Sequence, residues 1–353
     1  MIVVMWKVVA DQLFMQSTLY SKYYDHGQLL SYHCLFNMVI GHRGVGKTFK
    51  FKKWCIEDFI KEGKQFVWVR RYKDETKKLR TFFDDLVKAG YFLDHELAVR
   101  GDKSFGTFIV DGKIAGYYIT LSTSATLKSV PFPDVDKIVF DEFLIKSGAI
   151  HYLSDEVTTF LELVSTIFRD RDNVRGAYLI ANNISMSNPY FMYFGILPFK
   201  QRFYRKGEVL VENYKNQIYI DNIKETRWGK LIAGTQYYDY AVENQSLTDS
   251  DVFLEKRSDN SKFKFSIVYK SNIVGFWVDK DEGVMYATRE HDPSSPARYC
   301  LTREDHGPNL YLIKNIRNTH INDLVFFFDN GLLRFSDNQV KNICYDILSL
   351  FRK

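Results

Sequence analysis

Between residues 31 and 200, short apolar runs alternate with longer segments of helical periodicity. Each apolar run has the length of a strand and ends at polar or turn-forming residues, as buried strands do. The runs lie at 35–40, 65–69, 138–140 and 177–181. Helical segments separate them, at 49–60, 74–89 and 154–168. Strands that alternate with helices predict an α/β fold, in which helices cover both faces of a mostly parallel sheet.

A different pattern begins near residue 228. Alternating polar and apolar positions predict consecutive antiparallel strands, and two helical segments close the chain. The strands are expected at 263–269, 273–278 and 283–287, and the helices at 318–330 and 337–352. We therefore expect a smaller α+β domain at 228–353, a linker at 200–227, and a first domain at 1–199 that begins with an extension over 1–30. Within the first domain, Asp111-Gly112 between two β-like runs predicts a hairpin.

The composition changes this picture little, because 46% hydrophobic and 26% charged residues are typical of a folded protein. The aromatic share of 16% is high, and large cores or apolar contacts between subunits would account for it. A net charge of +5 permits a polyanionic partner without requiring one. Four cysteines without a C-x-x-C spacing favour neither zinc nor disulfides and fit a reducing compartment. No segment reaches the roughly 18 apolar residues of a membrane helix, so we expect an intracellular protein with no membrane partner.

Residues 41–48, GHRGVGKT, match the phosphate-binding pattern G-x-x-x-x-G-K-[ST] at every fixed position. A predicted strand leads into this loop and a predicted helix follows it, which is the context that the motif needs. The loop backbone would surround phosphate oxygens, and its residues before the lysine include Gly41, Arg43, Gly44, Val45 and Gly46. Lys47 would reach the β- and γ-phosphates of ATP, and Thr48 would offer its hydroxyl to Mg²⁺.

A second nucleotide element follows in Ile138-Val139-Phe140-Asp141-Glu142, an apolar strand that ends in two acids. This is the Walker B pattern. Asp141 would hold the Mg²⁺ shell, and Glu142 would polarise the attacking water as a general base. A Glu directly after the Asp favours ATPases with a strand inserted between the two motifs. The guanine-reading Asn-Lys-x-Asp of small GTPases is absent.

Three further features have two interpretations each. Asn182 or Asn183, at the end of the next strand, would sense hydrolysis through the γ-phosphate, or would be a turn residue. Arg169 would stabilise charge on a transferring phosphoryl group, or would belong to a solvated face of Arg and Asp residues. The basic residues of 70–80, Lys73 among them, would contact phosphates or form a solvated helix face.

Taken together, these motifs resemble the genome-packaging (encapsidation) ATPases of small Salas-type podophages, which are terminase-like ring motors. The similarity extends over nearly the whole chain from about residue 30. It includes the segments 66–73, 166–171, 188–191, 227–235, 252–258, 262–269 and 291–294. The resemblance implies a ring, a homopentamer, that is docked on a packaging RNA at the portal vertex of an empty prohead in the host cell cytoplasm. Such a ring drives double-stranded DNA inward with ATP.

The resemblance also implies roles for individual residues. Arg169 matches the family's trans-acting arginine finger. Lys73 matches a basic residue at the nucleotide site, and Lys128 matches a lysine between subunits. Lys47, Thr48, Asp141 and Glu142 take the roles given above.

The C-terminal domain of this family resembles the RNase H-like nuclease of larger packaging motors, which holds two metals with carboxylates on adjacent strands. Here the strand at 263–269 has no carboxylate, while Asp279, Asp281 and Glu282 crowd one turn. We therefore expect a vestigial nuclease that docks nucleic acid and prohead and does not cleave.

Two alternatives stay open. A different nucleic-acid-dependent P-loop ATPase, such as a helicase or a recombination ATPase, would need a further motif that we do not find, but the residues alone do not exclude it. An assembly module that is only stabilised by nucleotide has no need of a general base, so the intact Glu142 argues against it.

Overall fold

The computed structural model describes residues 23–145, 152–153, 155–169, 171–184, 188–196, 199, 201–243, 253–313 and 319–351. Contacts among the described residues divide them into two units. The first unit holds the residues up to 184 and those from 199 to 243, and the second holds 188–196 and those from 253 onward. No helix in these ranges is long and apolar enough to cross a bilayer.

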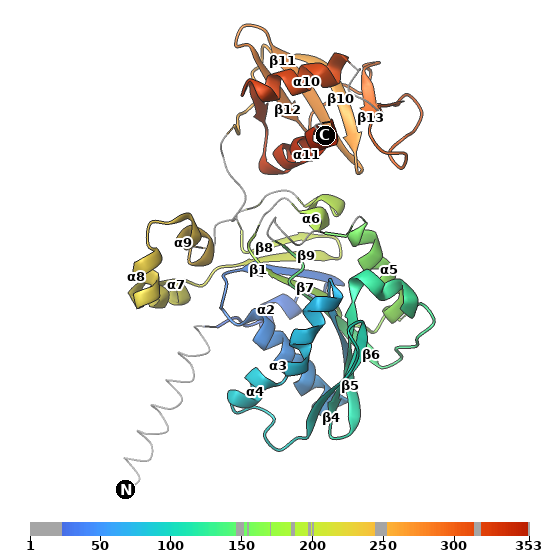
Figure 1. Ribbon diagram of the computed structural model, residues 1–353, viewed down its shortest axis with the longest axis vertical. Coiled ribbons are helices and arrows are strands. Elements are labelled where there is room, and N and C mark those ends of the chain that lie inside the picture. Colours follow the sequence, from blue (N-terminus) through green and yellow to red (C-terminus); the bar gives the residue numbers. More distant parts are fainter. Residues whose placement is uncertain are drawn as a thin grey trace. The chain divides into compact units, whose positions relative to one another are not determined.

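The first unit is built on a nine-stranded sheet of order β3-β4-β5-β2-β6-β7-β1-β9-β8 (Figure 1). The six neighbouring strands from β5 to β9 in this order are parallel, and antiparallel pairing adds β4, β3 and β8 at the two edges. The strands are β1 (Phe36–Gly41), β2 (Gln65–Arg70), β3 (Leu97–Gly101), β4 (Phe105–Val110), β5 (Lys113–Thr120), β6 (Val135–Asp141), β7 (Gly176–Asn182), β8 (Phe203–Lys206) and β9 (Val209–Tyr214). As predicted, β4 and β5 form a hairpin, and one strand, β7, lies between β1 and β6.

Two long helices, α3 (Lys47–Glu62) and α5 (Glu156–Phe168), cover opposite faces of this sheet (Figure 1). The chain moves along the sheet in one direction from β1 to β2 and in the other from β6 to β7, so right-handed crossovers place the two helices on opposite faces. The side chains agree. Trp54 of α3 packs on Tyr178 with ring centroids 5.1 Å apart, whereas Phe160 of α5 packs on Phe140 at 5.3 Å. The predicted α/β fold with helices on both faces is therefore confirmed.

Shorter helices complete the first unit. They are α2 (Gly27–Leu30), the 3₁₀ helices η1 (Lys73–Thr81) and η2 (Leu121–Leu127), α4 (Asp84–Lys88), α7 (Gln217–Glu225), α8 (Arg227–Ile232) and α9 (Gln236–Ala241). The single helix expected over 74–89 is thus wrong, because η1 and α4 divide that segment. The two elements separate at Phe82 and Phe83, which are both buried. Neighbouring positions lie roughly 100° apart on one helix, so a break between the elements lets both rings enter the core.

The linker expected at 200–227 is not a linker, because its residues form β8, β9 and α7. β9 pairs in parallel with β1 along its whole length. The polar Glu212 interrupts the apolar pattern of this strand and conceals it from a sequence-based prediction. In the structure Glu212 is fully buried and accepts hydrogen bonds from Tyr24 and Arg202. The second domain also begins later than expected, because α8 and α9 group with the first unit.

The predicted N-terminal extension is described only from residue 23 onward, and its first 22 residues lie outside the described ranges. The described part packs on the first unit. The Tyr24 N–H donates to the backbone oxygen of Val45 at 2.8 Å, and Leu29 is buried in the core. Residues 23–30 therefore belong to the first unit.

The second unit is a six-stranded mixed sheet of order β14-β13-β10-β11-β12-β15 with two long helices. Its elements are α6 (Pro189–Tyr193), β10 (Lys262–Tyr269), β11 (Asn272–Asp279), β12 (Val284–Thr288), β13 (Arg298–Cys300), β14 (Tyr311–Leu312), α10 (Thr319–Asp329), β15 (Leu333–Phe335) and α11 (Asn338–Phe351). The antiparallel meander β10-β11-β12 matches the prediction, whereas β13 and β15 add parallel pairs. α6 was expected in the first domain. It groups here because Met192 packs on this core and Gln339 donates to the Ile196 backbone oxygen at 2.7 Å.

Candidate functional site

The phosphate-binding loop follows the carboxyl end of β1, the edge where open α/β sheets bind ligands. Gly44 and Gly46 have φ angles of +86° and +82°, a backbone conformation that favours glycine. Gly41 is required for a different reason, because a Cβ there would lie 2.5 Å from the backbone oxygen of Tyr214. The glycines therefore let the loop curl onto the N-terminus of α3, which attracts anions.

Lys47 is buried in this loop at 7% exposure. Its Nζ donates to the backbone oxygens of Gly41 at 3.1 Å and His42 at 2.6 Å, and to Oδ1 of Asn182 at 3.4 Å. Burial lowers the pKa of Lys47 to about 7, although Asp141 counteracts this. A buried ammonium whose acceptors are all neutral oxygens is poorly stabilised until an anion joins it. The environment of Lys47 thus fits a polyphosphate.

Thr48 and Asp141 meet beside this lysine, where Thr48 Oγ1 donates to Asp141 Oδ1 at 3.0 Å. Asp141 is buried, and burial raises its pKa while Arg70 opposes that rise. A hydroxyl and a carboxylate are oxygen ligands of the type that Mg²⁺ prefers. The two residues from β6 and α3 therefore fit a magnesium site.

Glu142 follows Asp141 directly and has a positive φ of 60°. Its N–H donates to the Ile180 backbone oxygen at 2.8 Å, which holds it against β7. Its carboxylate accepts from Arg70, whose Nη1 lies 2.8 Å from Oε2, and Nη2 of the same arginine lies 3.4 Å from Asp141 Oδ2. One guanidinium at the end of β2 thus contacts both acids. From sequence, Arg70 was only one member of a basic cluster.

Arg71 serves a different purpose and was missed as a structural residue. Its guanidinium is buried and pairs with both oxygens of Glu156, at 2.7 and 2.8 Å. It also donates to the backbone oxygens of Glu142 at 3.2 Å and Phe143 at 2.7 Å. Arg71 therefore fixes the chain just after the two acids. Two consecutive arginines carry no sequence signal that tells one role from the other.

Of the two sensor candidates, Asn182 is the one whose side chain contacts Lys47. Asn183 instead uses its N–H, which donates to the Gly41 backbone oxygen at 3.2 Å, and its side chain is buried. Lys73 is exposed at the start of η1 and has no hydrogen bond or ion pair with the phosphate loop among the described residues. Lys128 pairs with Glu162 of α5 at 3.2 Å, with both side chains more than half exposed. The roles proposed for these residues stay predictions.

A segment that sequence reasoning missed covers the phosphate loop from outside. It runs from the end of β9 into α7. Tyr219 Oη donates to the Arg43 backbone oxygen at 2.7 Å, and the Asn216 N–H donates to His42 Nε2 at 3.2 Å. Burial lowers the pKa of His42 to about 4, which keeps its ring neutral and able to accept this bond. Only the pairing of β9 with β1 brings these residues to the loop.

Arg169 lies at the amino ends of the parallel strands, whereas the phosphate loop lies at their carboxyl ends. It follows α5 and precedes β7, at the amino ends of β6 and β7, whereas Asp141 ends β6. The seven residues of β6 span roughly 20 Å, which is longer than an arginine side chain. Arg169 therefore cannot reach the phosphate loop of its own chain. Its side chain is exposed and has no ion pair or hydrogen bond within the described residues.

Comparisons with known proteins show which family this chain resembles. The family model of the podovirus DNA encapsidation protein (Gp16) matches residues 18–353. The DNA packaging protein of Bacillus phage phi29 is 42% identical over 335 residues, which are 94% of this chain and 98% of that protein. The bacteriophage Phi-29 viral genome packaging motor assembly has a TM-score of 0.76 at 40% identity, over 93% of this chain and 99% of that chain. The N-terminal domain of the DNA packaging ATPase from bacteriophage phi29 has a TM-score of 0.50 at 40% identity, over 55% of this chain and 97% of that chain.

Proposed function

The chain belongs to the podovirus DNA encapsidation protein family, and from this premise we propose that it is an ATP-driven motor that moves double-stranded DNA into a viral prohead. One observation carries the proposal. At the carboxyl ends of β1 and β6, Thr48 donates a hydrogen bond to Asp141, while Lys47 of the same loop donates to Asn182 and to two loop carbonyls, and Glu142 directly follows Asp141. A relative of nearly full length is a DNA packaging protein.

Each of these residues has a chemical task in ATP hydrolysis. The loop and Lys47 bind the β- and γ-phosphates, and Thr48 and Asp141 would hold Mg²⁺, which neutralises phosphate charge when bound. Glu142 accepts a proton from the attacking water. The ion pair with Arg70 engages Oε2 of Glu142, so hydrolysis requires this pair to separate and free the carboxylate for the water. Asn182, already in contact with Lys47, would detect the γ-phosphate.

The active unit is a ring in which each nucleotide site lies at a subunit interface. An arginine that is exposed one strand length from its own site is suited to complete a neighbour's site, and this supports Arg169 as the finger. Lys128 would act at the same interface and Lys73 at the nucleotide site. From the family resemblance, the ring is a homopentamer on packaging RNA at the portal vertex in the host cytoplasm. The strand between β1 and β6 and the Glu after Asp141 fit the additional-strand, catalytic-Glu class of P-loop ATPases.

The second unit would dock nucleic acid and prohead on an RNase H-like scaffold without cleaving. Its antiparallel meander with β13 parallel to β10 is compatible with such a scaffold. Asp279 is engaged structurally, because its Oδ1 accepts the N–H groups of Asp281 and Glu282 at 2.9 and 3.0 Å. Within the described residues there is no group of three or more His, Cys, Asp or Glu side chains that could hold a metal.

ATP turnover and DNA protection in reconstituted proheads test the proposal. We expect turnover of the full chain to rise when DNA and RNA-bearing proheads are both present, and we expect DNA to become resistant to nuclease inside the prohead. Lys47→Ala should abolish both signals, while Lys61→Ala, an exposed lysine at the end of the same helix, should preserve them. Strand separation without proheads would favour a helicase. Packaging by a Glu142→Gln protein, which keeps ATP bound but does not hydrolyse it, would favour a nucleotide-stabilised assembly module.

A further inference from the structure

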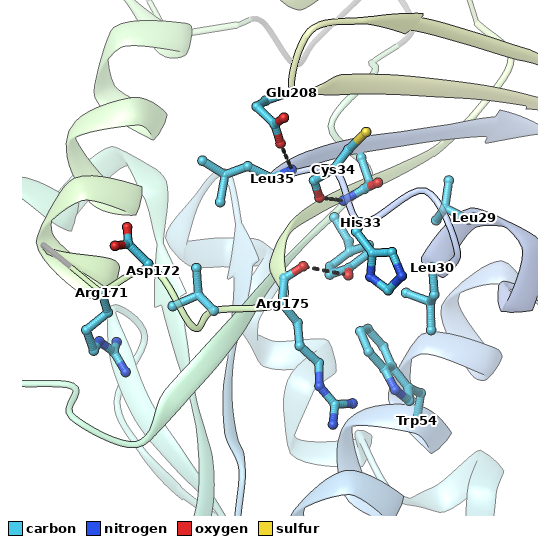
Figure 2. Close-up of a pocket in the computed structure, with 13 residues that line it drawn as sticks. Leu29, Leu30, His33, Cys34, Leu35, Trp54, Arg171, Asp172, Arg175 and Glu208 are labelled. Atoms are coloured by element: carbon cyan, nitrogen blue, oxygen red, sulfur yellow. Dashed lines mark hydrogen bonds between the residues drawn. The ribbon is translucent and has the colours of Figure 1, made fainter.

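The segment that carries Arg169 is uncovered on one side. A cavity of about 530 Å³ lies at the amino ends of β1 and β7, and residues 171, 172, 174 and 175 form part of its lining (Figure 2). Arg169 has a φ of 50° and a ψ of −130°, a backbone conformation that residues other than glycine rarely adopt. Because residues 171, 172, 174 and 175 line this cavity, they lack apolar packing on that side, and polar contacts contribute to holding the chain that follows Arg169.

Arg171 supplies most of these contacts. Its guanidinium donates to four backbone oxygens, those of Pro133 at 2.6 Å, Ile167 at 2.7 Å, Phe132 at 3.0 Å and Phe168 at 3.2 Å. Two of the four oxygens belong to the residues just before Arg169, and two belong to the segment that enters β6. One side chain therefore ties the end of α5 to the sheet, immediately beside the exposed arginine.

The other end of the segment is fixed independently. The Arg175 N–H donates to the Asp136 backbone oxygen at 2.7 Å, and its guanidinium pairs with Glu62 at 2.7 Å and with Asp136 at 3.3 Å. Asp136 also pairs with Lys137, which is completely buried, at 2.7 Å. A buried ion cluster thus anchors residue 175, and the strand that follows begins at 176. Between this anchor and α5, Arg171 is the cation that holds the chain.

We propose that Arg171 is a positioning residue for Arg169. It does not contact the nucleotide of either subunit. Its four bonds to carbonyl oxygens hold the backbone of the finger in the one conformation that presents Arg169 to the neighbouring site. The proposal rests on the proposed function, in which Arg169 acts in trans. Guanidinium suits this task because its fixed fork of donors reaches several carbonyls at once, which a lysine ammonium cannot reproduce.

Mixing of subunits tests the proposal. We expect Arg171→Ala to reduce ATP turnover of the assembled ring by about tenfold to a hundredfold, since small misplacements of a catalytic group have costs of this size. ATP affinity should stay unchanged. When Arg171→Ala subunits are mixed with Lys47→Ala subunits, turnover should recover, because one partner has an intact nucleotide site and the other an intact finger. A mixture of Arg171→Ala with Arg169→Ala should not recover, because neither partner has a working finger.

Two controls separate this proposal from its premise. Arg169→Ala mixed with Lys47→Ala should recover turnover; failure of this pair would overturn both proposals. Recovery of this pair without recovery of the Arg171→Ala mixture would overturn the positioning role alone, as would normal turnover of Arg171→Ala. Arg205→Ala, an exposed arginine of the same unit, should change nothing. Should Arg171→Ala not fold, Arg171→Lys keeps the charge and should show a smaller loss with the same mixing pattern, and the absence of that pattern would overturn the proposal.

Discussion

Arginines have different surroundings at the carboxyl ends and at the amino ends of the parallel strands, which we call the carboxyl edge and the amino edge of the sheet. At the carboxyl edge, Arg70 and Arg71 are both buried, and each is bound to a carboxylate close to the end of β6. At the amino edge, Arg171 and Arg175 are held by carbonyls and by carboxylates, and Arg169 between them and α5 is exposed. A dense cluster of arginines in the sequence therefore does not tell which of them are engaged structurally. The contacts of each side chain do, and they leave Arg169 as the exposed one that we propose for catalysis.

Removal of the exposed arginine at the amino edge should have the largest effect. We expect Arg169→Ala to lower turnover of the assembled ring by about 10³- to 10⁵-fold, the range known for arginine fingers, while ATP binding changes little. Single-turnover kinetics and equilibrium binding on the same rings measure the two quantities. Normal ATP hydrolysis by this variant would contradict the proposal, because Arg169 at the amino ends of the strands would then have no role in catalysis.

At the carboxyl edge, Glu142→Gln should keep ATP bound but reduce turnover by about 10²- to 10⁴-fold, because only the proton acceptor is lost. The matched control is Glu96→Gln, an exposed glutamate of the same unit. Turnover and nucleotide affinity are measured for both variants. If Glu142→Gln weakened binding as much as Lys47→Ala, its carboxylate would serve the ligand rather than the water.

The buried pair of Arg71 and Glu156 distinguishes a structural arginine from a catalytic one. Arg71→Ala leaves a buried carboxylate unpaired, so we expect a loss of about 3–5 kcal/mol in the free energy of unfolding. Lys128→Ala breaks an exposed pair with Glu162 and should cost less than about 1 kcal/mol. Urea unfolding of the two variants compares them. Equal losses would contradict the distinction that burial draws between the two pairs.

The effect of burial on an ionisable side chain can also be tested by pH. His26 is buried and has no ion pair among the described residues. Burial between Phe51 and Trp54 lowers its pKa to about 4. The unfolded chain protonates below about 6.5, so stability should fall as pH drops from 6.5 toward 4, by about 2 kcal/mol at pH 5. His26→Phe should remove this part of the acid loss, and His42 should retain its own part. Unfolding measured at pH 7 and pH 5 shows whether the difference appears only at the lower pH.

The smallest effect is expected in the second unit, where the basic residues lie near β10. Arg257 is engaged, since it pairs with Glu290 at 3.0 Å and lies 4.2 Å from the Trp277 ring centroid. Lys256 and Lys262 are exposed and have no ion pair among the described residues. If they contact phosphates, replacing both by alanine in the full chain should lower the salt slope of nucleic-acid binding by about two. An unchanged slope would assign this surface to protein contacts.

Local patterns were enough to locate the nucleotide motifs and to predict much of the fold. The loop 41–48 predicted its own position between a strand and a helix, because its glycines and lysine act through neighbours in the chain. The acids at 141 and 142 predicted the inserted strand, and Asp111-Gly112 predicted the hairpin of β4 and β5. The alternation from 263 onward predicted the antiparallel meander. Each of these features depends on residues that are close together in the sequence.

Several contacts around the site join residues that are far apart in the chain, so the sequence did not predict them. Arg71 finds its carboxylate 85 positions away, and Tyr219 meets the phosphate loop 176 positions away. Burial of Glu212 in β9 costs free energy that the hydrogen bonds from Arg202 and Tyr24 offset. Because these partners lie elsewhere in the chain, the sequence around 209–214 does not look like a buried strand. A residue type and its spacing determine which chemistry is available. The fold determines which arginine is buried beside an acid and which is exposed. The connections between strands place some arginines at the carboxyl ends of the strands and others at the amino ends.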